Sequence, residues 1–270
     1  MSIQQIGARI SQSLGRNSAV VRLFRPAYER LLDSRGGFQR TVNDRETFLI
    51  DPRHRGLFPE TYEPTVCNFL RANVQPGDIC LDVGAHVGIY ALCLARWSAP
   101  NGRVFAFEPN PDTRAVLESN VRRNPERDRI TVIPKGVSDL PGEATFFAAG
   151  IEGFSRLGEP NRERPEQHRS FQVAITTIDD FCAEEQVRPD WILIDIEGYE
   201  VAALCGARHT IASCRPRLVV EMHPFLWNSA GTSAEEFRRL LDELQLVPKP
   251  LSGQNDLWAE NGQVLLGTAN

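Results

Sequence analysis

A glycine-rich turn and two acidic residues follow neighbouring apolar stretches of this sequence, where they could hold a nucleotide-like ligand. The first stretch runs into LDVGAHVG, residues 81–88, in which Asp82 precedes Gly84 and Gly88. Glycine lets the backbone turn sharply and lets a ligand approach closely, and the helix expected after the turn offers free N–H groups. The next apolar stretch ends at Glu108, whose carboxylate could accept hydrogen bonds from both hydroxyls of a ribose.

The charge of Asp82 distinguishes two cofactor classes that use this geometry. A dinucleotide dehydrogenase carries G-x-G-x-x-G so that pyrophosphate can lie at the helix terminus, whereas the glycines here are spaced G-x-x-x-G. A carboxylate beside the turn would repel pyrophosphate but attract the ammonium and sulfonium groups of S-adenosylmethionine. We therefore expect S-adenosylmethionine as the cofactor, with an NAD-dependent Rossmann-fold oxidoreductase as the alternative.

A second group of ionisable residues follows two later predicted strands, 191–194 and 218–220. Asp195 ends the first of these strands, and Glu221 and His223 follow the second. In a doubly wound sheet ligands bind beyond the carboxyl ends of the strands, so Asp195 should face the sulfonium side of the cofactor. Because side chains alternate along an extended backbone, Glu221 and His223 should point the same way.

These three residues suit methyl transfer to a hydroxyl, which needs the oxygen in line behind the methyl group and a base for its proton. His223 is the expected base, with Glu221 or Asp195 beside it, because an imidazole ordinarily titrates near neutral pH. In the metal alternative, Asp195, Glu221 and His223 would bind a divalent cation that acidifies the hydroxyl; a base without a metal is preferred. A third interpretation is a buried Glu221–His223 pair that only orients the loop at Pro224.

The residues after Asp195 also bear on the acceptor. Enzymes that methylate amino groups of nucleic acids or proteins would more naturally carry Asn/Asp-Pro-Pro-aromatic here, whereas this chain has Asp195-Ile196-Glu197-Gly198. Oxygen is therefore the expected acceptor atom. Acidic residues outnumber basic ones by 35 to 30, and the net charge of −5 gives nucleic acid no reason to accumulate on the surface.

Short apolar stretches alternate with helical patterns from residue 60 onward, which is typical of the α/β class with a parallel sheet. We expect a Rossmann-like, doubly wound, seven-stranded and mostly parallel sheet in a domain of residues 60–270, with its last two strands in the tail. The other elements are expected at strands 79–83, 103–107, 130–133, 191–194 and 218–220, and at helices 87–97, 111–124, 199–213 and 233–246.

Two segments lie outside this alternation. Residues 1–59 are expected to form an N-terminal helical extension, with apolar residues at helical spacing in residues 1–40 that predict two amphipathic helices. We expect these helices to pack on the main domain or on a second subunit; since the stretch is basic, weak contact with a membrane surface is the alternative. Residues 143–177 are predicted to be a hairpin-like insertion around the polar segment 150–170.

The composition, with 41% hydrophobic and 24% charged residues, is that of an ordinary soluble globular protein. The six cysteines show no metal-binding spacing, and the first residues do not resemble a secretory signal, so we expect reduced thiols and a cytoplasmic protein. No stretch is apolar enough for a transmembrane segment. The expected partner is a small-molecule or saccharide acceptor, and a homo-oligomer is compatible with the sequence.

A series of motifs between about residues 60 and 225 resembles the FkbM type of class I S-adenosylmethionine-dependent methyltransferases. The motifs are DVGAHVG (82–88), FEP (107–109), GVSD (136–139), TIDD (177–180), DIEGYE (195–200) and VEMHP (220–224). The resemblance implies methylation of a hydroxyl of a saccharide, glycolipid or secondary metabolite. A non-catalytic module that only binds S-adenosylmethionine is a further alternative.

Carried over position by position, the resemblance implies a cofactor site around the glycine turn. Glu108 would hold the ribose, and Asp139 would lie beside the adenine. Tyr62 and Glu63 would close over the cofactor. The residues implied to surround its methionine portion are Gly84, Ala85, His86 and Gly88.

Two positions depart from the pattern of this family. His86 stands where members usually have Asn, and its imidazole would keep a polar contact at the turn. Leu193 lies two residues before Asp195, where many members have Lys. A role that the family gives to a cation at that position therefore does not carry over to this chain.

Overall fold

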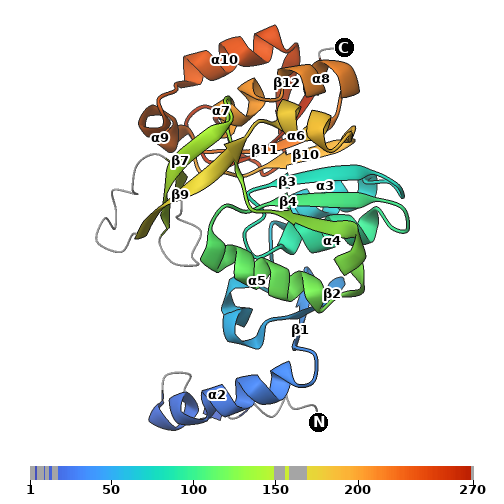
Figure 1. Cartoon of the computed structure of the whole chain (residues 1–270), viewed down its shortest axis with the longest axis vertical. Coiled ribbons are helices and arrows are strands. Elements are labelled where there is room, and N and C mark those ends of the chain that lie inside the picture. Colours follow the sequence, from blue (N-terminus) through green and yellow to red (C-terminus); the bar gives the residue numbers. More distant parts are fainter. Residues whose placement is uncertain are drawn as a thin grey trace.

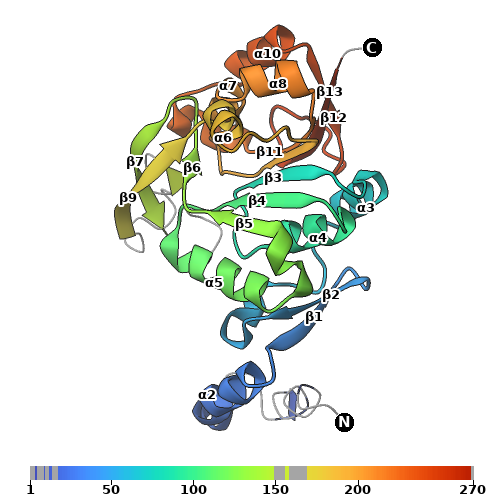
Figure 2. The ribbon, with the colours of Figure 1, turned by 45° about the vertical axis from the view of Figure 1, so that its right-hand side comes forward.

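The computed structural model describes residues 18–148, 156–157 and 169–268, together with positions 4, 9, 12 and 13. Its centre is a sheet of seven strands: β3 (Ile79–Val83), β4 (Arg103–Phe107), β5 (Ile130–Ile133), β10 (Trp191–Ile194), β11 (Arg217–Met222), β12 (Leu246–Pro250) and β13 (Gly262–Thr268). Their order is β12-β13-β11-β10-β3-β4-β5, and β13 runs opposite to the other six strands (Figure 1; β5 and β13 are labelled in Figure 2). The predicted mostly parallel, seven-stranded sheet is confirmed.

The strand order brings the two groups of predicted site residues to one edge of the sheet. β3 pairs with β4 on one side and with β10 on the other, and β10 pairs with β11. Because these four strands are parallel, their carboxyl ends lie at the same edge. This is the crevice in which doubly wound sheets bind their ligands.

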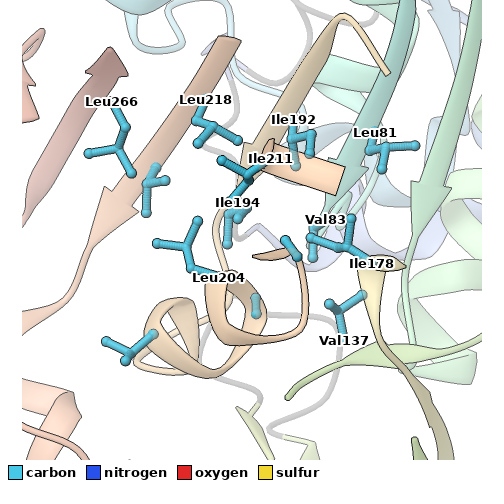
Figure 3. Close-up of a cluster of buried hydrophobic side chains, with 14 of the residues drawn as sticks. Leu81, Val83, Val137, Ile178, Ile192, Ile194, Leu204, Ile211, Leu218 and Leu266 are labelled. Atoms are coloured by element: carbon cyan, nitrogen blue, oxygen red, sulfur yellow. The ribbon is translucent and has the colours of Figure 1, made fainter. Parts of the chain in front are cut away.

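Helices cover both faces of the sheet. One face packs against α3 (Pro64–Asn73), α4 (Ile89–Trp97) and α5 (Pro111–Arg122). The other packs against α6 (Ile178–Glu184), α7 (Glu200–Cys205), α8 (Arg208–Cys214) and α10 (Ala234–Glu243). Figure 3 shows the core of this second face, in which Leu81 and Val83 of β3 lie near Ile192 and Ile194 of β10. Since side chains alternate along a strand, Asp82 points to the opposite face, towards α4.

The structure divides one predicted helix into two. The sequence pattern predicted a helix over residues 199–213, but α7 ends at Cys205 and α8 begins at Arg208. Gly206 lies at the break, and its Cα packs against backbone: a Cβ there would lie 2.3 Å from the carbonyl oxygen of Ser138. By contrast, α10 begins after Ser233 as predicted, and the Ser233 hydroxyl accepts a hydrogen bond from the backbone of Glu236 at 3.2 Å.

The N-terminal extension is only partly helical. Helix α2 (Ala19–Asp33) is the second predicted helix, whereas the first lies mostly outside the described residues. The extension then continues as a hairpin of β1 (Phe38–Val42) and β2 (Glu46–Ile50) and a 3-10 turn, η1 (Pro52–Leu57). The helical prediction for residues 1–59 is therefore wrong from residue 38 onward, where the hairpin packs into the same core as α3 and α4.

The apolar stripe of α2 packs on the domain only in part. Leu32 is buried, but Val20 is 49% exposed and Phe24 is 63% exposed. For those two side chains the expected packing on the main domain is not seen in the described residues. Among these same residues, no helix is long and apolar enough to cross a membrane.

The insertion forms a small second sheet beside the main one (Figure 2). β7 (Gly142–Ala148) and β9 (Arg169–Thr176) pair antiparallel, as the hairpin prediction requires, and they are flanked by β6 (Gly136–Val137) and β8 (Arg156–Leu157). Most of the polar segment 150–170 lies outside the described residues. The remaining short elements are η2 (Pro125–Arg129), α9 (Pro224–Trp227) and η4 (Asn228–Ala230).

Candidate active site

A cavity of about 250 Å³ opens at the carboxyl ends of β3, β4, β10 and β11. Most residues that the sequence singled out line its wall. These residues are Glu63, Asp82, Gly84, Ala85, His86, Glu108, Asp195 and Glu221. Two others, Gly88 and His223, contact lining residues from behind: the Gly88 N–H donates to the carbonyl of Ala85, and His223 Nε2 lies near Asp195 and Glu221.

The glycine turn joins the two halves of this cavity. Gly84 has a φ of +93°, and a Cβ at this position would lie 1.8 Å from the backbone oxygen of Asp195. The N–H groups of Gly84 and Ala85 donate hydrogen bonds to the carbonyl of Phe107, at 3.1 and 2.9 Å. The turn is thus packed between the ends of β4 and β10, and only glycine allows that approach.

Glu108 lies at the end of β4 with each carboxylate oxygen already accepting one backbone hydrogen bond. His86 N–H donates to Oε2 at 3.0 Å, and Asn110 N–H donates to Oε1 at 2.8 Å. Burial raises the pKa of Glu108 to about 8, although these two hydrogen bonds oppose the rise. Since each oxygen has a further lone pair, the carboxyl group suits the two vicinal hydroxyls of a ribose.

Asp82 offers a buried oxygen to the cavity. Its side chain is 4% exposed, and within the described residues its Oδ2 has no hydrogen-bond partner. Burial raises the pKa of Asp82 to about 7. The register places Leu193 of β10 directly beside Asp82, so the position where the resembling family often carries Lys provides no cation here. A cationic group of the expected methyl donor fits this oxygen.

Tyr62 and Glu63 form one wall of the cavity together with Tyr90, which the sequence did not single out. The Tyr90 hydroxyl donates to Glu63 Oε2 at 2.5 Å, and the rings of Tyr62 and Tyr90 pack edge to face with centroids 5.3 Å apart. Burial raises the pKa of Glu63. The two residues that precede α3 and Tyr90 of α4 therefore form an aromatic and acidic wall.

The opposite side of the cavity carries a cluster of carboxylates around one imidazole, as the sequence predicted. His223 Nε2 lies 3.9 Å from Asp195 Oδ1, 3.8 Å from Glu221 Oε1 and 3.9 Å from Glu197 Oε2. Burial within the cavity and the charge of Glu221 raise the pKa of Asp195. Its side chain is nevertheless 41% exposed, so a molecule in the cavity can reach it.

Two residues that the sequence gave no role fix the members of this cluster. Glu200, which is fully buried at the start of α7, contacts His223 Nδ1 at 2.8 Å through Oε1 and accepts from the Trp227 indole at 2.9 Å through Oε2. Gln263 of β13 donates to Glu221 Oε2 at 2.9 Å. Glu200 belongs to the DIEGYE motif, and this motif is the sequence feature from which a role for Glu200 could have been predicted. No local sequence pattern indicates a role for Gln263.

The environment of His223 changes its expected chemistry. Burial by itself would lower the pKa of His223, but the hydrogen bond with Glu200 and the charges of Glu200, Asp195 and Glu197 raise it to about 10. An imidazolium has no lone pair for a further proton. In the protein without a bound cation, a carboxylate of the cluster is therefore better suited than His223 to accept a proton at neutral pH.

Asp139 does not join the cavity. It is exposed after β6, where the Ser138 hydroxyl donates to it at 3.0 Å, and it borders a separate pocket together with Arg208 and Glu236. The part of the cavity below the insertion is lined instead by Lys135, Gly136, Phe146 and Leu157. The apolar side chains of Phe146 and Leu157 come from the insertion and suit a planar base.

Comparisons with known proteins identify one family of enzymes. The family model described as methyltransferase FkbM domain matches residues 82–247. The hexuronic acid methyltransferase AglP of Haloferax volcanii is 29% identical over 187 residues, which cover 68% of this chain and 70% of that protein. The 31-O-demethyl-FK506 methyltransferase FkbM of Streptomyces tacrolimicus is 27% identical over 184 residues, covering 57% of this chain and 70% of that protein.

Comparison with solved structures gives further matches. A methyltransferase FkbM from Methylobacillus flagellatus KT is 20% identical, with a TM-score of 0.48. The similar region covers 70% of this chain but only 43% of that chain, so the present chain spans less than half of that solved protein.

Proposed function

This chain belongs to the FkbM methyltransferase family, and on that premise we propose that it transfers a methyl group to a hydroxyl of a saccharide, glycolipid or secondary metabolite. The chain is an enzyme, and S-adenosylmethionine is its methyl donor. The observation that carries the proposal is the position of Asp195: its backbone packs on Gly84 of the donor-side turn, and its carboxylate lines the same cavity as Asp82.

Residues of β3 and β4 bind the donor in this proposal. Asp82 accepts a hydrogen bond from the ammonium group, using the oxygen that has no partner among the described residues. Glu108 accepts hydrogen bonds from the ribose hydroxyls, while His86 N–H and Asn110 N–H hold its carboxyl group in place. Charge-assisted hydrogen bonds of this kind are the strong ones, and inside a cavity they are poorly screened.

Residues of β10 and β11 handle the acceptor. The hydroxyl oxygen attacks the methyl carbon from the side opposite the sulfur, so it must lie between the donor and this cluster. We assign its proton to the carboxylate of Glu221, which is 22% exposed and is held by Gln263 through its other oxygen. Asp195 orients the hydroxyl, and the positive charge of His223 balances the carboxylates.

The acceptor class is supported by the relatives and by the motif after Asp195. One relative is named for a hexuronic acid and another for 31-O-demethyl-FK506. The chain also lacks the Asn/Asp-Pro-Pro-aromatic sequence that amino-group acceptors favour, since Asp195 is followed by Ile196 and Glu197. A hydroxyl acceptor must lose its proton, and the carboxylates of this site can accept it. A neutral amine attacks through its lone pair and does not need such a base.

The experiment that tests the proposal is mass spectrometry after incubation with isotopically labelled S-adenosylmethionine. We expect a labelled methyl on an oxygen of hexuronic acids, hexuronic-acid-containing glycolipids or polyhydroxylated macrolides. Glu221→Gln should abolish labelling, and Glu185→Gln, at an exposed acid of the α6 terminus, should leave it intact. Labelling confined to nitrogen or carbon, with wild-type donor affinity, would refute the hydroxyl assignment.

A further inference from the structure

We propose that Asp195, Glu221 and His223 form a binding site for a divalent cation of the Mn²⁺ class, within the active site and next to the methyl donor. The inference rests on the proposed transfer to a hydroxyl and adds to it the group that activates that hydroxyl. A ligand set of two carboxylates and one imidazole suits Mn²⁺ and related hard or borderline cations.

The donor atoms are spaced as ligands of one ion. One ligand atom from each of the three residues lies within 4.8 Å of the others. From Nε2 of His223 the distances are 3.9 Å to Asp195 Oδ1 and 3.8 Å to Glu221 Oε1. Two atoms that each lie about 2.1 Å from a common ion are separated by roughly 3 to 4 Å, depending on their angle. An ion therefore fits between them with side-chain adjustments alone.

The orientation of His223 is the second and independent observation. The residue is 4% exposed, and its ring is turned so that Nδ1 faces Glu200 at 2.8 Å. Nε2 consequently points at Asp195 and Glu221, yet in the described part of the chain no atom lies within hydrogen-bonding distance of it. A buried histidine whose free ring nitrogen faces three carboxylates at 3.8 to 3.9 Å has the geometry of a metal ligand.

Glu200 supplies the support that histidine ligands generally need. A carboxylate that accepts the Nδ1–H bond fixes the tautomer with its lone pair on Nε2 and holds the ring in place. Glu200 is itself held by the backbone N–H of Gly198 at 2.8 Å and by the indole of Trp227 at 2.9 Å. Gly198 and Trp227 thus hold Glu200 in place, and Glu200 holds the imidazole of His223 in one direction.

The charge around the site also calls for a cation. Asp195, Glu197 and Glu221 all come within 4 Å of His223 Nε2. Among the described residues that line the cavity, Lys135 is the one Lys or Arg, and it follows β5, three strands away from β10 in the sheet. Leu193 of β10, which pairs with Asp82 in the sheet, is apolar and supplies no positive charge.

A cation here would lower the pKa of an acceptor hydroxyl that approaches the donor. With the ion bound, Glu221 is a ligand, so the O–H bond breaks with its proton passing to Glu197 or to water instead of to Glu221. A lone pair of the oxygen forms the new bond to the methyl carbon, and the carbon–sulfur bond breaks with its electron pair left on sulfur. The products are the methyl ether and S-adenosylhomocysteine.

The test is Mn²⁺ binding to the chelator-treated full chain, followed by electron paramagnetic resonance and by calorimetry without donor or acceptor. We expect saturable binding of one Mn²⁺ per chain. Asp195→Asn and Glu221→Gln should each weaken it at least tenfold, while Glu185→Gln should match the wild type. Glu200→Gln, which leaves all three ligands in place, should weaken it 10- to 100-fold.

Two results would overturn the proposal: no saturable Mn²⁺ binding to the wild type, or equal binding by all four variants. Binding of S-adenosylmethionine by each variant verifies that it is folded. Failure of the metal site is distinguishable from failure of the proposed function, because a chelator-treated enzyme that still labels a hydroxyl refutes only the metal. A metal-loaded enzyme that labels no hydroxyl refutes only the acceptor.

Discussion

The two sides of the cavity use the same residue types in opposite ways. On the side of β3 and β4, Asp82 and Glu108 are buried carboxyl groups, and the Glu108 oxygens accept hydrogen bonds from backbone N–H groups. On the side of β10 and β11, the carboxylates of Asp195 and Glu221 surround His223, whose direction is set by another side chain, Glu200. Backbone N–H groups therefore fix the carboxyl group of Glu108 on the first side, whereas hydrogen bonds between side chains fix His223 and Glu221 on the second.

This difference corresponds to the two proposed roles: donor binding on the side of β3 and β4, and methyl transfer on the side of β10 and β11. A carboxyl group held by the backbone keeps its position when neighbouring side chains change, which suits recognition of an invariant donor. A network of side chains depends on the identity of each member, so it can differ between enzymes that share a fold. We therefore expect substitutions on the two sides to affect different measured quantities.

The largest expected effect is on turnover. Glu221→Gln removes the proposed proton acceptor while keeping the hydrogen-bonding shape, and it should lower kcat by about 100-fold or more. The dissociation constant of S-adenosylmethionine should stay within about threefold of the wild type, because Glu221 lies on the other side of the cavity. Kinetics and calorimetry on the same preparation check this. An equal loss of donor affinity would remove the distinction between the two sides.

The reverse pattern is expected for Asp82→Asn. This change removes the charge that meets the ammonium group and should weaken donor binding by roughly 10- to 100-fold, as a charge-assisted hydrogen bond is lost. At saturating donor, kcat should change by less than about threefold. Val83→Ile changes the size of the neighbouring apolar side chain in β3 and keeps Asp82. It tests whether altered packing of β3 by itself weakens donor binding. A large fall in kcat at saturation would contradict the assignment of Asp82 to binding.

Donor binding should also depend on pH through Asp82. Burial raises the pKa of this carboxyl to about 7, so below that pH it carries a proton that must leave when a cation binds. Affinity should rise by up to about tenfold per pH unit between pH 5.5 and 7. The slope should flatten in Asp82→Asn and persist in Glu221→Gln, which calorimetry at several pH values can measure.

The same raised pKa has a consequence for stability, with a defined sign. Because the unfolded state releases the Asp82 proton near pH 4 and the donor-free folded state holds it to about pH 7, the free energy of unfolding should fall as the pH rises across this interval. Urea unfolding of the wild type and Asp82→Asn should show the difference. A parallel pH dependence in both proteins would contradict the burial argument.

The smallest effect on the site is expected from Asp51, which follows the N-terminal hairpin and does not line the cavity. Asp51 accepts hydrogen bonds from Arg53 and from Ser119 of α5, and Asp51→Ala should lower the free energy of unfolding by about 1 to 3 kcal/mol. Donor affinity and kcat of the folded fraction should be unchanged. Asp128→Ala, at an exposed acid, is the matched control.

The Asp51 contribution also has a pH window. Burial acts to raise the pKa of Asp51, but hydrogen bonds from Arg53 outweigh it and leave the pKa well below its ordinary value. A depressed pKa stabilises the folded state above about pH 4 and loses that contribution as the pH falls further. The stability difference between wild type and Asp51→Ala should therefore shrink below pH 4, and an unchanged difference would contradict this origin.

Local patterns were enough for the sheet and for the donor side of the site. The five predicted parallel strands are present, because buried parallel strands are continuous apolar runs between recognisable turn residues. Asp82 lies near the end of one such strand, and Gly84 and Glu108 directly follow two of them, so the sequence could place all three at one edge of the sheet. Where the chain departs from regular alternation, the predictions were weaker: the hairpin of β1 and β2 was assigned to a helical extension, and the helix over 199–213 is broken at Gly206.

The sequence by itself determined that carboxylates and an imidazole gather at one edge of a parallel sheet, since strand pattern and motif order are local properties. Only the tertiary structure decided what each group can do there. Asp139 lies outside the cavity, Gln263 reaches Glu221 from the last strand, and Glu200 turns His223 towards the carboxylates. Burial and hydrogen bonding between residues far apart in the chain set ionisation and direction, and neither is encoded in the spacing of neighbours.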